Sequence, residues 1–194
     1  MKNIYNEEYF KSNNYVNYLS KKERYIRTAN EIYNIMSKFS IIDFDTKILD
    51  YGCSVGFLIN GLEKVGCKSV YGYDISEWAS SEAKKNGCKI LENPSGEYEL
   101  GIFLDVLEHM TDNEIHELFN KIKTKRILVR IPCAIETNPS MFHLEVSRRD
   151  ETHINCKTDK EWILFFENLG YNNHFRLNLT TIYDSDGCFC CLFV

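Results

Sequence analysis

The fold of this chain is decided by the stretch Lys47–Phe57, which reads KILDYGCSVGF. In it an apolar strand ends at the acidic Asp50, and a tight glycine turn then opens a helix. A second apolar strand, Val70–Asp74, also ends on a carboxylate. This pair is typical of α/β sheets that hold a nucleoside. The backbone packs against the ligand at the glycine turn, and a carboxylate binds the ribose hydroxyls.

The glycine spacing separates two kinds of nucleoside site. A dinucleotide fold has G-x-G-x-x-G, but here Ser54 and Phe57 occupy the second and third glycine positions counted from Gly52. The order from Asp50 to Gly56 is instead an acid, any residue and then G-x-G-x-G with Ser54 at the middle glycine. This pattern resembles the class I S-adenosylmethionine (SAM)-dependent methyltransferases. We expect Ser54 to be tolerated with a negative φ.

Strands and helices alternate along the rest of the chain, which predicts a parallel sheet with crossover helices. Two turn-linked strands end the chain, and the resemblance implies that the last one inserts antiparallel. We therefore predict a Rossmann-like α/β class I methyltransferase fold. It has a seven-stranded, mostly parallel sheet with an antiparallel last strand and helices on both faces. The expected strands lie near 47–52, 69–74, 88–91, 100–104, 126–131, 175–179 and 188–194.

Two parts make up the predicted organisation. Residues 1–39 form an aromatic arm, including Tyr15, followed by a helix whose cap is Ser20, and residues 40–194 form the SAM-binding domain. The connection 134–157 has little periodicity, as functional loops often do. A turn at Asp184–Gly187 joins the last two strands.

Composition narrows the function classes. The net charge of −5 gives no broad basic surface, which makes a nucleic-acid partner unlikely. No signal peptide or apolar run of membrane-span length is present, so we expect a cytoplasmic protein with no membrane partner. Of the eight cysteines, only Cys188 and Cys191 have C-x-x-C spacing, and alternation along the expected final strand puts these two on opposite faces. We therefore expect reduced core fillers and no metal site. The oligomeric state stays open.

The resemblance assigns the cofactor site to SAM. Asp50 would lie near the amino-acid end of SAM, and the backbone of the glycine turn would pass under the ligand. Asp74 follows Gly52 at about the spacing of a ribose-binding acid, with capping of the next helix as its alternative role. The residues expected to bind SAM are Asp50, Gly52, Ser54, Gly56, Asp74, Ile75, Asn93 and Asp105.

Two motifs in the second half resemble catalytic segments of the family. Asp105–His109 reads D-V-L-E-H, like the motif that ends the fourth strand in these enzymes. Asp150–His153 reads D-E-T-H, like the D-P-T-H stretch of small bacterial methyltransferases. His153 is our first candidate for a general base, with Asp150 orienting its ring, and His109 is the second. The alternative is that these residues only order their loops.

These features predict an enzyme that transfers a methyl group from SAM to a small or medium polar acceptor. A sugar or polysaccharide precursor is one possible acceptor, suggested by resemblance alone, and a lipid-quinone or other small metabolite is another. A non-catalytic methyltransferase-like partner subunit remains an alternative. A nicotinamide-dependent oxidoreductase is opposed by the glycine spacing.

Overall fold

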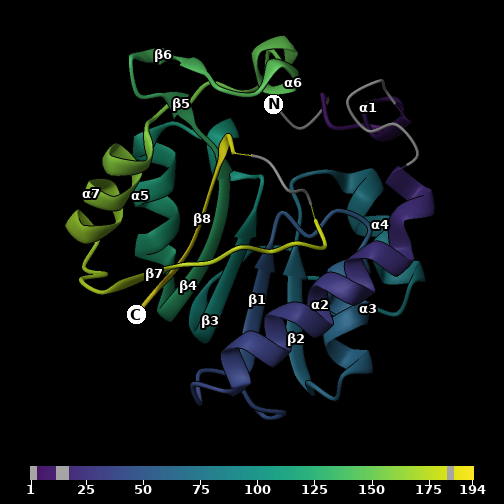
Figure 1. Cartoon of the computed structure of the whole chain (residues 1–194). Helices are drawn as coiled ribbons and strands as arrows, with labels where there is room; N and C mark the ends of the chain where they lie inside the picture. Colours follow the sequence, from purple (N-terminus) through teal and green to yellow (C-terminus); the bar gives the residue numbers. More distant parts are fainter. Residues whose placement is uncertain (1–3, 12–17, 183–185) are drawn as a thin grey trace. The chain divides into compact units, whose positions relative to one another are not determined.

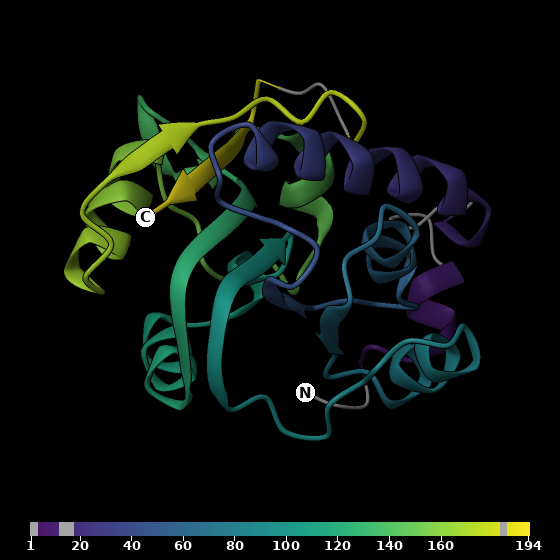
Figure 2. The ribbon, with the colours of Figure 1, turned by 90° about the horizontal axis from the view of Figure 1, so that it is seen from below.

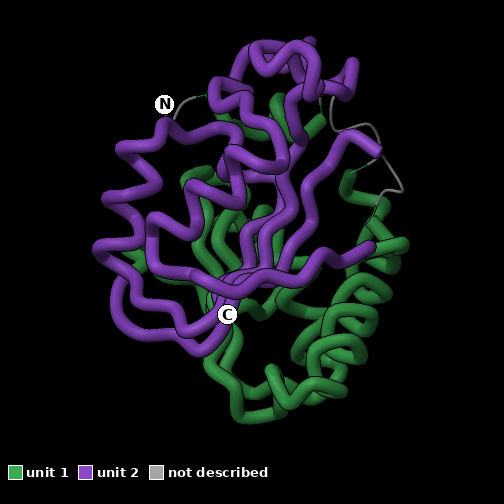
Figure 3. The backbone as a smooth tube through the Cα atoms, turned by 60° about the vertical axis from the view of Figure 1, so that its left-hand side comes forward, with its two compact units in different colours: residues 1–94, 179–184 green, residues 95–178, 185–194 purple. Residues whose placement is uncertain are grey.

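The computed structural model describes residues 4–11, 18–182 and 186–194. Tyr15 of the predicted arm, and Asp184 and Ser185 of the predicted turn, lie outside the described residues. The chain forms two compact units, coloured separately in Figure 3. Unit 1 comprises residues 1–94 and 179–184, and unit 2 comprises residues 95–178 and 185–194.

Unit 1 is built on two parallel strands, β1 (Lys47–Tyr51) and β2 (Ser69–Tyr73), which lie side by side in Figure 1. Helix α3 (Phe57–Lys64) connects them, and α4 (Glu77–Lys85) follows β2. Helix α2 (Lys22–Ser37) packs closely on α3. At their contact a Cβ added to Gly61 would lie 2.5 Å from Cβ of Ala29, so only glycine permits this approach.

The N-terminal segment packs on unit 1 through aromatic rings. It contains α1 (Glu7–Lys11) and the 3-10 helix η2 (Tyr18–Lys21). Phe10 stacks on Trp78 with ring centroids 5.3 Å apart, and Tyr18 stacks on Phe57 at 5.8 Å. Burial of these rings fastens the segment to the start of α3 and α4. The predicted cap of α2 is wrong: η2 leads directly into α2, whose N-cap is Lys21, not Ser20.

Unit 2 contains β3 (Gly96–Leu104) and β4 (Ile122–Pro132), which are parallel. Strand β8 (Cys188–Phe193) pairs antiparallel with β4, and β7 (His174–Arg176) pairs antiparallel with β8 (Figure 2). The last strand is therefore inserted against the direction of its neighbours, as predicted. Helices α5 (Asp112–Lys121) and α7 (Asp159–Asn168) each begin with a capping box.

Two predictions about the sheet are corrected. Among the described residues the main sheet has six strands, in place of the seven expected. The segment predicted as a strand at 88–91 makes only one bridge, between Ile90 and Gly72, because the chain turns away at the bends that follow. Within 134–157, predicted as irregular, lie the hairpin β5 (Ala134–Ile135) and β6 (Asn138–Phe142) and the short helix α6 (Glu145–Arg149). The fold class itself is confirmed.

Across the part of the chain that the structure describes, no helix has the length and apolar character needed to cross a membrane.

Candidate functional site

In unit 1, Asp74 joins the glycine turn to the loop after β2. Its Oδ2 accepts a hydrogen bond from the backbone N–H of Ser54 at 2.7 Å, and its Oδ1 accepts from that of Ser76 at 2.8 Å. Ser76 is the N-cap of α4, and its side chain accepts a hydrogen bond from the backbone N–H of Ala79. Asp74 therefore does not cap the helix. It holds two loops in register and retains further lone pairs for a ligand.

The turn itself is built from left-handed residues. Gly52 has a φ of +79°, Gly56 of +82° and Ser54 of +48°. The expectation of a negative φ at Ser54 is therefore wrong, and a non-glycine residue in this region costs about 1–2 kcal/mol. The strained conformation accompanies the hydrogen bond from the Ser54 N–H to Asp74. Strain of this kind is often stored at ligand sites.

Asp50 lies at the end of β1 with only 4% of its surface exposed. Its Oδ2 has no hydrogen-bond partner among the described residues. Burial, together with the negative charge of Asp74, raises the pKa of Asp50 to about 7. Burial also raises the pKa of Asp74, although the N–H groups of Ser54 and Ser76 oppose this. A cationic or hydroxyl-bearing ligand would stabilise both carboxylates in their ionised form.

Helix α3 adds donors to the same region. Gly56 is its N-cap, and no side chain of the described residues caps it. The N–H groups of its first turn therefore offer a site for a carboxylate.

Two further predicted cofactor residues also lie in unit 1. Ile75 follows Asp74 and is 38% exposed, so an apolar surface stands beside the carboxylate. Asn93 is exposed in a bend after the bridge at Ile90. The structure thus brings Asp50, the glycine turn, Asp74 and Ile75 together, whereas Asn93 makes no hydrogen bond or ion pair with them among the described residues.

Asp105, the remaining predicted cofactor residue, lies at the end of β3 in unit 2. Its carboxylate forms an ion pair with Arg130 of β4, and its backbone has a left-handed φ of +54°. Arg130 is buried, and Cys188 lies 3.2 Å from its Nη2. Sequence reasoning missed Arg130, although a charged residue inside the apolar run of β4 was a visible signal.

The predicted catalytic residues cluster in unit 2. His109 and His153 have ring centroids 4.6 Å apart at 80°, and Nε2 of each lies 4.0 Å from Oε1 of Glu108. Nε2 of His153 also lies 3.8 Å from Oδ2 of Asp150. Thr152, which the sequence did not single out, contacts both His109 and Asp150.

Burial governs the charges of this cluster. It raises the pKa of Glu108 well above its usual range, with Asp105 adding to the effect. It lowers the pKa of His109 to about 4 and also lowers the pKa of His153. Burial works against ionisation of Asp150 as well, but hydrogen bonds from Thr152 bring the net pKa of Asp150 below its usual value. Both imidazoles are therefore neutral at neutral pH.

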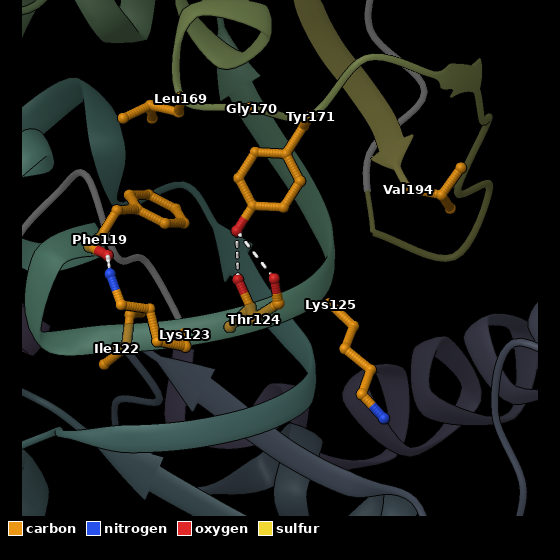
Figure 4. Close-up of a pocket in the computed structure, with 9 residues that line it drawn as sticks. All are labelled: Phe119, Ile122, Lys123, Thr124, Lys125, Leu169, Gly170, Tyr171 and Val194. Carbon is orange, nitrogen blue, oxygen red and sulfur yellow. Dashed lines mark hydrogen bonds between the residues drawn. The ribbon is translucent and has the colours of Figure 1, made fainter.

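A cavity of about 240 Å³ lies elsewhere in unit 2, beside the amino end of β4 (Figure 4). The Tyr171 hydroxyl reaches Thr124 at its rim. Ligands of parallel α/β sheets bind at the carboxyl ends of strands, so this cavity is not the candidate site.

The strand arrangement and the turn at Asp50 define a Rossmann-like fold of the SAM-binding type. A family profile described as "Methyltransferase domain" matches residues 14–174. The chain therefore belongs to the methyltransferase-domain family. A search of curated protein sequences finds no match.

Solved structures of methyltransferases share the fold. Magnesium protoporphyrin IX methyltransferase from Synechocystis PCC 6803 with bound SAH is 18% identical, with a TM-score of 0.66 over 99% of this chain and 97% of that one. The plantazolicin methyltransferase BpumL, with a pentazolic desmethylPZN analog and SAH, is 14% identical, with a TM-score of 0.64 over 96% and 90%. Family and fold agree with the predicted SAM-dependent methyltransferase and support SAM as its cosubstrate.

Proposed function

We propose that unit 1 binds SAM and that the protein transfers its methyl group to a small or medium polar acceptor. In this proposal Asp74 accepts the ribose hydroxyls and Asp50 faces the cationic amino-acid end. Backbone of Gly52, Ser54 and Gly56 packs under the ligand. Ile75 and Asn93 contact the adenine. The observation that carries the proposal is the pair of buried carboxylates, Asp50 and Asp74, at a left-handed glycine turn.

In the transfer, a lone pair of the acceptor's oxygen or nitrogen attacks the methyl carbon. The carbon–sulfur bond breaks, and its electrons go to sulfur, leaving S-adenosylhomocysteine. A hydroxyl or ammonium acceptor must also lose a proton, and we propose His153 as the base that takes it. Its neutral ring and its neighbour Asp150 support that role. His109 is the second candidate, although a pKa of about 4 makes it the weaker base. In this proposal Asp105, whose carboxylate pairs with Arg130, contacts SAM near the transferring methyl group.

The acceptor class rests on fewer observations. The names of the solved relatives include a magnesium protoporphyrin IX methyltransferase and a plantazolicin methyltransferase, and neither names a sugar. The sugar prediction therefore has no support from the comparisons. Two alternatives to a small polar acceptor remain. One is a lipid-quinone or another small metabolite as the acceptor, and the other is a non-catalytic subunit that supports a partner protein.

We expect His153→Gln to lower kcat about 100-fold, the loss typical of a missing general base. The SAM dissociation constant should be unchanged, because His153 has no role in the proposed cofactor site. The measurement is transfer of radiolabelled methyl from SAM to a panel of hydroxyl and amine acceptors, followed by titration of SAM into the same variant.

The matched control is His116→Gln, which replaces an exposed histidine of the same unit and should leave kcat as it is. An equal kcat for wild type and His153→Gln would remove His153 from the mechanism. An absence of transfer to every acceptor would favour the silent partner subunit.

A further inference from the structure

Lone pairs converge in the cluster of Glu108, His109 and His153 in unit 2. One ligand-type atom from each residue lies within 4.8 Å of the other two. Glu108 is fully buried. Within the described part of the chain, neither of its carboxylate oxygens has a hydrogen-bond partner. The Nδ1 atom of His153 also has no hydrogen-bond partner there. Such an unpartnered buried carboxylate is costly, and its presence requires an explanation.

The hydrogen bonds around His109 place its proton. Its Nδ1 lies 3.2 Å from the carbonyl oxygen of Thr152 and 2.9 Å from the Thr152 hydroxyl. That hydroxyl donates its own proton to Oδ1 of Asp150 at 2.5 Å. Both Thr152 oxygens can therefore only accept from the ring, so Nδ1 carries the proton. Nε2 then presents a lone pair toward Oε1 of Glu108.

This arrangement is the usual one for a histidine that binds a metal. Such a histidine donates its other N–H to a carbonyl or carboxylate, which fixes the tautomer and the ring. The segments that carry the three side chains are also tied together. The carbonyl of Glu108 accepts hydrogen bonds from the N–H groups of Ile154 and Asn155, each at 2.9 Å. The cluster is therefore held by backbone as well as by side chains.

We infer that Glu108, His109 and His153 bind a divalent transition-metal ion of the Zn²⁺ or Co²⁺ type through one carboxylate and two imidazoles. Two nitrogen ligands disfavour Mg²⁺ and Ca²⁺, which prefer oxygen. Zinc-to-ligand distances of about 2.1 Å put neighbouring ligands about 3.4 Å apart in a tetrahedron. The 4.0 Å separations from Glu108 Oε1 to the two Nε2 atoms need only small side-chain rotations to close. The sequence predicted no metal site, so this inference departs from that prediction.

Three protein ligands leave a fourth position for a water or an acceptor oxygen. An acceptor hydroxyl bound there would lose its proton more readily, which deepens the proposed function and rests on it. In that case His153 acts as a ligand, and its loss would lower kcat by removing the ion. Binding of the ion itself does not depend on methyl transfer.

The test is calorimetric titration of Co²⁺ into the chelator-treated full chain, with absorption spectra of the same samples. Wild type should bind one Co²⁺ per chain, with no thiolate-to-cobalt charge-transfer band despite the eight cysteines. Glu108→Gln and His153→Gln should each bind at least tenfold more weakly, and the control His116→Gln should match wild type. Without metal, Glu108→Gln should unfold at the same temperature as wild type or higher, because the buried carboxylate becomes neutral.

The inference is overturned if wild type binds no Co²⁺, if both variants bind as tightly as wild type, or if the spectrum shows thiolate ligation. Titration of SAM into the same samples separates the two claims. Cobalt binding without SAM binding would contradict the proposed function alone. SAM binding without cobalt binding would contradict the metal site alone.

Discussion

Replacing Asp50 with Asn should stabilise the protein most strongly at alkaline pH. In the folded protein the pKa of Asp50 is about 7, against 3.8 for an ordinary aspartate. Because the pKa of Asp50 is higher in the folded than in the unfolded state, its ionisation destabilises the native state. This destabilisation grows as pH rises from about 4 to 7 and is complete above 7. At about 1.4 kcal/mol per pKa unit, the cost at pH 8 is on the order of 4 kcal/mol as an upper value.

Urea unfolding of wild type and Asp50→Asn at pH 5 and pH 8 measures this effect. The variant should gain roughly 2–4 kcal/mol at pH 8 and clearly less at pH 5. The control Asp45→Asn removes an exposed carboxylate of unit 1 and should change little at either pH. Equal gains at both pH values would show that Asp50 does not titrate in this range.

Asp50→Asn should also weaken the binding of SAM. The proposed role of Asp50 is to face the cationic amino-acid end, and an amide gives up that charge. We therefore expect greater stability with lower affinity, a trade-off typical of binding sites.

Gly56→Ala should lower the free energy of unfolding by about 2–5 kcal/mol. Two costs add. Alanine at a φ of +82° is strained by about 1–2 kcal/mol. Its Cβ would also lie 2.3 Å from Sγ of the buried Cys88, which must move, and overpacking of this kind costs about 1–3 kcal/mol.

Gly87→Ala is the matched control, because Gly87 has a φ of +86° but nothing within 4 Å of its added Cβ. It should show the backbone cost alone. Cys88→Ala should restore part of the loss in the Gly56→Ala background, which a double-mutant cycle measures. If Gly56→Ala and Gly87→Ala were equally stable, the contact with Cys88 would carry no weight.

The sequence predicted the fold best where a local pattern coincides with burial. The run from Lys47 to Phe57 combines an apolar strand with a glycine turn that opens a helix, and β1 lies in it while α3 begins at its last residue. The capping boxes at Thr111 and Thr158 are visible in the same way, because each depends on residues only three apart. Local chemistry of this kind needs no tertiary information.

The features that the sequence did not predict depend on contacts between segments distant in the chain. Residues 88–91 have strand composition, but pairing beyond one bridge requires a neighbour in register. The left-handed φ at Ser54 accompanies a hydrogen bond to Asp74, twenty residues away. In the cluster of Glu108, His109 and His153, the hydroxyl of Thr152 contacts His109, which lies 43 residues earlier. The pattern of one sequence does not show which distant residues contact one another in the fold.

The most direct test of the account is calorimetric titration of SAM and S-adenosylhomocysteine into wild type, Asp74→Ala and Asp43→Ala. Asp43 also accepts backbone N–H groups in a loop of unit 1, from Asp45 and Thr46, so it controls for the loss of such hydrogen bonds. The account predicts that wild type and Asp43→Ala bind both ligands alike, and that Asp74→Ala binds at least tenfold more weakly, about 1.4 kcal/mol. No binding to wild type, or equal affinities for all three proteins, would contradict the proposed SAM site.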